Sequence, residues 1–80
     1  MFTDYEFREF AESYTQTMMR LVKTEVLSGN ITNRSQLKIY ADDVRDFLKG
    51  EADTPRQGII ASECALDFAL EAVEYLESHK

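Results

Sequence analysis

Three segments of this chain each begin with a helix-capping signal and then repeat apolar residues every three or four positions. That spacing places the apolar side chains on one face of an α-helix, which has about 3.6 residues per turn. The sequence therefore predicts an all-α fold, a small three-helix bundle that forms one helical domain over residues 1–80. Short connections favour mainly antiparallel neighbours. The predicted helices span residues 4–27, 34–49 and 55–77.

The first two predicted helices have matching start signals. Thr3 with Glu6, and Asn33 with Gln36, have the spacing of a capping box, in which each side chain bonds the other residue's backbone N–H. Gly50 follows the last apolar residues of the second segment and is expected to end that helix.

The third predicted helix starts most clearly and is the most apolar. Thr54 is the expected cap, Pro55 suits the first helical position, and Gln57 is expected to close a capping box. Apolar residues then cover roughly two-thirds of the circumference, against about 100° for an ordinary surface helix. Bulky residues flank a line of small ones, which we call the alanine ridge: Gly58, Ala61, Ala65, Ala69 and Ala72. The third helix is therefore either the centre of the domain or half of a homodimer interface formed through this ridge.

The net charge of −6 restricts the class of partner. Direct binding to nucleic acid depends on lysine and arginine displacing counterions, so an acidic chain is poorly suited to it. The charge instead favours a protein partner with a basic surface. No apolar run approaches the roughly 20 residues of a membrane span, so no membrane partner is expected. The N-terminal residues lack a secretion-signal pattern and the single Cys64 fits a reducing compartment, so we expect a cytoplasmic protein.

Residues that usually carry chemistry are scarce. Cys64 lies beside Glu63 with no cation next to it, and the one histidine, His79, is next to the C-terminus. A reactive thiolate needs cationic neighbours, and no Cys or His pair has the spacing of metal ligands. The sequence predicts no catalytic residue, no metal and no cofactor, and therefore a protein that is not an enzyme.

The strongest positive signal is a row of four acids on the third predicted helix. Spacings of four, four and three place them on one face, although like charges at such spacings cost an isolated helix about 0.2–0.5 kcal/mol per pair. We call these residues the acidic row: Glu63, Asp67, Glu71 and Glu74.

Three interpretations of the acidic row remain open at this point. It is an ordinary solvated face, or it pairs inside the domain with a line of cations on the second helix, or it is a binding surface. As a binding surface it would coarsely imitate the charge of a nucleic-acid backbone and enter a basic groove. We call the line of cations the basic row: Arg34, Lys38, Arg45 and Lys49.

Two isoleucines are candidate anchors for a contact patch. Ile39 lies between Asp43 and Asp46 on the polar side of its helix, and Ile60 lies beside the acidic row. An apolar residue ringed by acids suits the centre of an interface. The predicted partner-binding residues are Glu63, Asp67, Glu71, Glu74, Ile39, Asp43, Asp46 and Ile60.

Two functional hypotheses follow from these features. The favoured one is a small, acidic, non-catalytic protein that engages a basic surface of a larger protein as an inhibitor or modulator, for example of nucleic-acid-handling machinery. The alternative is a homodimeric structural or regulatory subunit, in which the acids only maintain solubility and no nucleic acid is imitated.

Overall fold

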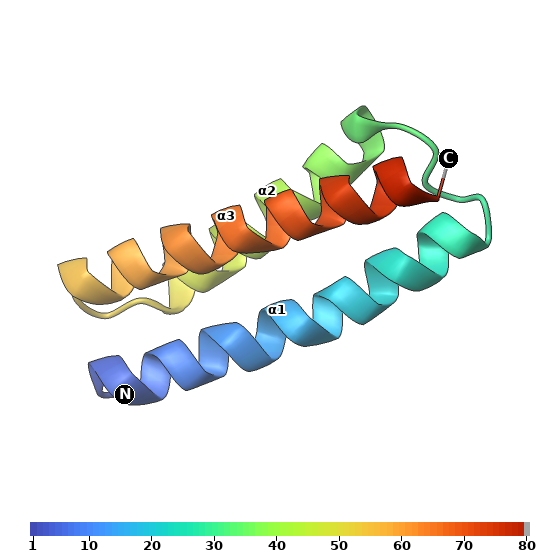
Figure 1. The fold of residues 1–80 in the computed structure, drawn as a ribbon. Coiled ribbons are helices and arrows are strands. Elements are labelled where there is room, and N and C mark those ends of the chain that lie inside the picture. Colours follow the sequence, from blue (N-terminus) through green and yellow to red (C-terminus); the bar gives the residue numbers. More distant parts are fainter. Residues whose placement is uncertain (80) are drawn as a thin grey trace.

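The computed structural model describes residues 1–79 as three helices without a strand (Figure 1). This confirms the all-α bundle. Helix α2 runs antiparallel to both of its neighbours, whereas α1 and α3 run parallel to each other. The molecule is elongated along the helices, with extents of 39 × 18 × 15 Å. The helices are α1 (Asp4–Leu27), α2 (Arg34–Glu51) and α3 (Pro55–Ser78).

Helix α3 is the centre of the bundle. It packs extensively against both α1 and α2, which have little contact with each other. Ala61, Ala65 and Ala72 of the alanine ridge are buried, and Gly58 and Ala69 are half-buried. Small side chains suit this position because they let neighbouring helices approach closely. The ridge therefore belongs to the core of the domain, and the prediction of a homodimer interface built on the ridge is wrong.

Large side chains from all three helices fill the rest of the core. Phe7, Val22, Val44 and Leu48 have no exposed surface, and α3 contributes Phe68 and Leu76 beside its alanines. Where α1 and α2 approach each other, the link is aromatic: the rings of Tyr14 and Phe47 stack with their centroids 4.6 Å apart.

Both capping boxes predicted for α1 and α2 are present. The Thr3 N–H donates to Glu6 Oε1 at 2.9 Å, and the Gln36 N–H donates to Asn33 Oδ1 at 3.1 Å. The predicted end of α2 is wrong, because the helix continues through Gly50 to Glu51. Gly50 does not have the positive φ that lets glycine end a helix. Gly29, in the turn after α1, has such a conformation, with a φ of 84°.

The start of α3 departs from the prediction at Gln57. Its backbone N–H bonds the Thr54 cap as expected, but its side chain does not close a capping box. The side-chain Oε1 accepts instead from the Asp53 N–H at 2.9 Å. The Nε2 donates to the Phe2 carbonyl oxygen at 2.9 Å and to Asp4 Oδ1 at 3.2 Å. A side chain expected to act locally therefore ties the start of α1 to the start of α3.

Candidate functional site

The acidic row lies on the surface of α3. Glu63, Asp67, Glu71 and Glu74 are all exposed. Their spacing brings neighbouring members to within about 5–6 Å of each other along the helix axis, at about 1.5 Å per residue. Asp67 and Glu71 also line a groove between α3 and α1, so the row follows the flank of α3 that borders α1.

The groove beside the acidic row has a volume of about 360 Å³. Its floor is apolar and consists of Met19, Cys64 and Phe68. The wall contributed by α1 is polar and of mixed charge, with Glu12, Thr15, Gln16, Arg20 and Lys23. The acidic row is therefore the more negative of the two walls.

One member of the acidic row is paired with a cation of α1. Lys23 Nζ lies 3.7 Å from Glu71 Oε2 and 5.4 Å from the centre of the Tyr75 ring. Both partners of the ion pair are exposed, so the pair contributes at most about 1 kcal/mol to stability. Glu71 is consequently the least available of the four carboxylates.

The other three members make no ion pair within residues 1–79. Glu63 borders a second hollow of about 450 Å³, which Arg8 and Arg56 also line. Asp67 and Glu74 have no hydrogen bond to their carboxylates within the same residues. These carboxylates are held on a rigid helix with their charge directed to solvent.

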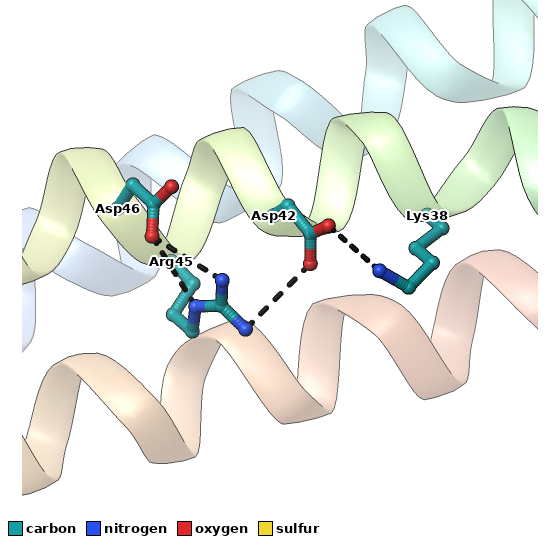
Figure 2. A network of polar contacts seen from close by, with 4 residues as sticks. All are labelled: Lys38, Asp42, Arg45 and Asp46. Atoms are coloured by element: carbon teal, nitrogen blue, oxygen red, sulfur yellow. Dashed lines mark hydrogen bonds and ion pairs between the residues drawn. The ribbon is translucent and has the colours of Figure 1, made fainter.

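The basic row forms its ion pairs mainly within α2 (Figure 2). Lys38 Nζ lies 3.1 Å from Asp42 Oδ2, and Arg45 lies 3.6 Å from Asp42 and 3.3 Å from Asp46. These contacts span one, three or four residues, so they are made along a single helix.

Only Arg34 of the basic row pairs with α3 in the described part of the chain. Its Nε lies 3.2 Å from Oε1 of Glu77, which is not a member of the acidic row. The interpretation in which the two rows neutralise each other inside the domain is therefore wrong for residues 1–79.

Of the two candidate isoleucines, Ile39 is exposed and Ile60 is buried. Ile39 is 64% exposed between the exposed Asp43 and Asp46, as an anchor requires. Ile60 is only 5% exposed, so its prediction as a surface anchor is wrong. Its neighbour Ile59 is 61% exposed instead, because consecutive residues of a helix point about 100° apart.

A line of exposed apolar residues on the outer face of α3 was not predicted from the sequence. Ile59, Leu66 and Leu70 are 61%, 59% and 57% exposed, and Val73 is half-buried. The unusually wide apolar arc of this helix was the signal, but the arc alone does not show which part packs inside. We call these four residues the apolar stripe.

Cys64 is buried in the core, whereas His79 is exposed just after the end of α3. Burial raises the pKa of the Cys64 thiol, although the Arg8 charge acts in the opposite direction, so the reactive thiolate is disfavoured. The His79 ring stacks on Tyr75 at 4.0 Å, with Nδ1 2.8 Å from the Tyr75 carbonyl oxygen. Within residues 1–79, no cluster of three or more His, Cys, Asp or Glu residues could hold a metal ion.

Comparisons with protein-family models, with curated proteins and with solved structures find no match to this chain. Across the described residues, no helix is both long enough and apolar enough to cross a membrane.

Proposed function

We propose that this chain is a non-catalytic binding protein whose acidic row engages a basic surface of a larger protein and inhibits or modulates it. The observation that carries the proposal is the exposure of Glu63, Asp67 and Glu74 without an ion-pair partner in residues 1–79. A row of like charges is unfavourable for an isolated helix, and no cation of the basic row compensates it. A cationic partner would remove that repulsion.

The chemistry of the row indicates the kind of partner. Its carboxylates repeat about every 5–6 Å, whereas a DNA strand carries one charge about every 3.4 Å. The row is thus a dilute but rigid line of negative charge that would suit a groove lined by lysine and arginine. Proteins that handle nucleic acids have such grooves, and we place the interaction in the cytoplasm.

A charge reversal tests the proposal. The double variant Glu63→Lys with Asp67→Lys changes the acidic row at two positions that make no ion pair in residues 1–79. The matched control is Glu9→Lys with Glu51→Lys, which makes the same change of net charge at exposed positions on α1 and α2. Wild type and both variants serve as baits in a lysate of the native host, and captured proteins are identified by mass spectrometry.

The proposal expects the wild type and the control to capture the same basic protein, and the row variant to lose it. Affinity for the purified protein should fall by about 10- to 100-fold in the row variant. Equal capture by all three baits, or capture of a partner without a basic surface, would contradict the proposal. Circular dichroism checks that each variant is folded.

A further inference from the structure

Within residues 1–79, neither α1 nor α2 covers the outer face of α3, where Ile59, Leu66 and Leu70 are exposed. The apolar stripe covers it over most of its length, and three of its four members are more than half exposed. Ile59, Leu66 and Val73 are spaced by seven residues, so they stay in line when two helices pack at a shallow angle. A continuous apolar line of this kind is typical of an interface.

Opposite charges flank the apolar stripe. The Arg34–Glu77 ion pair shows that the basic row runs along the edge of α2 that borders α3, and Figure 2 shows Lys38 and Arg45 on that edge. On the other flank, the acidic row runs along the groove toward α1. The face therefore has three parallel bands: the basic row, whose Arg34, Lys38 and Arg45 already have carboxylate partners within the copy, the apolar stripe and the acidic row.

We propose that a second copy of this chain covers the face, with the two α3 helices parallel and a two-fold axis running along them. This axis brings the apolar stripes together and places the basic row of each copy opposite the acidic row of its partner. The other arrangement, with antiparallel α3 helices, would place like charges opposite each other. Charge complementarity therefore selects both the occupant and its orientation.

The helix register supports this pairing of rows. The Arg34–Glu77 ion pair fixes the level of α2 beside α3 at one end of the bundle. The two helices are antiparallel and each rises about 1.5 Å per residue. Measured along the bundle axis, Lys49 therefore lies within about one helical turn of Glu63, and Lys38 lies within about one turn of Glu74. An axis along the helices preserves these levels in both copies. The ion pairs within α2 are exposed and weak, so they present little obstacle to exchange.

The available area requires the whole face to take part. The longest two extents of the molecule, 39 and 18 Å, bound a flat area of about 700 Å². A standard specific interface buries about 800 Å² per partner. The apolar stripe alone is too narrow, so the charged bands must lie within the interface.

This inference goes beyond the proposed function, because its partner is the chain itself. A second copy seated on this face covers much of the acidic row. A basic partner protein would therefore bind in competition with the second copy.

The oligomeric state is measured by sedimentation equilibrium with the wild type, Leu66→Glu and Ile39→Glu. The two replaced side chains are 59% and 64% exposed, so both variants should fold and carry the same charge. We expect the wild type and Ile39→Glu to sediment at twice 9.2 kDa, and Leu66→Glu at 9.2 kDa. Because the two-fold axis places the Leu66→Glu substitution in both copies, the dimer Kd should rise at least about 100-fold. A monomeric wild type, or a dimer that Leu66→Glu leaves intact, overturns the proposal.

Disulfide trapping tests the orientation. In a Cys64→Ala background, three samples are oxidised: the Ile59→Cys variant, the Val73→Cys variant and an equimolar mixture of the two. Parallel helices bring each residue to its own counterpart, within the roughly 4.4–6.8 Å Cα separation of a disulfide, so each variant should cross-link with itself. Cross-links only between Ile59→Cys and Val73→Cys would show antiparallel helices and contradict the proposal.

A charge exchange separates this proposal from the proposed function. Lys49 and Glu63 do not pair within one copy, so an ion pair between them would have to join the two copies. Lys49→Glu or Glu63→Lys alone should therefore weaken the dimer, and the double variant should restore it. Capture of a basic protein should depend on Glu63 and should not be rescued by Lys49→Glu. An absence of rescue in the dimer refutes the arrangement of rows, whatever the capture experiment gives.

Discussion

Replacing Gln57 with leucine tests whether one buried amide joins the starts of two helices. The Gln57 side chain is only 1% exposed and makes three hydrogen bonds. It accepts from the Asp53 N–H at 2.9 Å and donates to the Phe2 carbonyl oxygen at 2.9 Å and to Asp4 Oδ1 at 3.2 Å. Leucine has a similar volume and helix propensity but makes none of these bonds. The variant therefore removes the polar link and leaves the packing nearly unchanged.

The expected destabilisation follows from the number of bonds lost. Each hydrogen bond contributes about 0.5–1.5 kcal/mol, so three contribute about 1.5–4.5 kcal/mol. The more apolar leucine recovers about 1 kcal/mol by its own burial. The free energy of unfolding should therefore fall by about 0.5–3.5 kcal/mol, with about 2 kcal/mol at the centre of that range. In a domain of this size, 1 kcal/mol shifts Tm by about 4–8 °C, so the central value corresponds to a fall in Tm of about 8–16 °C.

Thermal and urea unfolding followed by circular dichroism measures this change. The matched control is Gln36→Leu in the capping box of α2, where Gln36 also bonds two backbone N–H groups and one carbonyl. Gln36 is only half-buried, so water can replace its bonds and the loss should be about 1 kcal/mol or less. Equal losses in the two variants, or no loss in Gln57→Leu, would refute the role assigned to Gln57.

Three further predictions concern single groups. The hydrogen bonds from Thr3 lower the pKa of Glu6. This cap should therefore stabilise α1 fully at pH values above the ordinary pKa of a glutamate, and the stabilisation should be lost as the pH falls through the lowered pKa. An NMR titration in which Glu6 has an ordinary or raised pKa would contradict this. Burial of Cys64 should make its alkylation by iodoacetamide far slower in the native protein than in urea, and equal rates would show that the thiol is accessible. Gly29 has a φ of 84°, so Gly29→Ala should cost about 1 kcal/mol in unfolding free energy, and a stabilised variant would contradict the strain.

The sequence predicted the helices well because their signals are local. The Thr3–Glu6 and Asn33–Gln36 boxes act over three residues, and the apolar periodicity is a property of each segment alone. Gln57 has the same local signal, but its partners include Phe2, which is 55 residues away in the chain. Such a partner is set by the arrangement of the bundle, which capping rules do not contain.

The candidate surface was harder to predict for the same reason. The four acids could be assigned to one face from their spacing, but only the packing of α3 between α1 and α2 decides which neighbouring residues are exposed. A difference of one position separates the buried Ile60 from the exposed Ile59. The pairing of Lys38 with Asp42, instead of with α3, likewise depends on side-chain geometry that a line of charges does not specify.

The central claim is that the acidic row binds a basic protein through its charge. The most direct test is the salt dependence of Kd for the protein that the wild type captures, measured with the wild type and with the Glu63→Lys, Asp67→Lys variant. The claim predicts that wild-type affinity falls steeply as ionic strength rises, and that the variant binds more weakly and with a shallower dependence. An equal Kd for the two proteins at every salt concentration would contradict it.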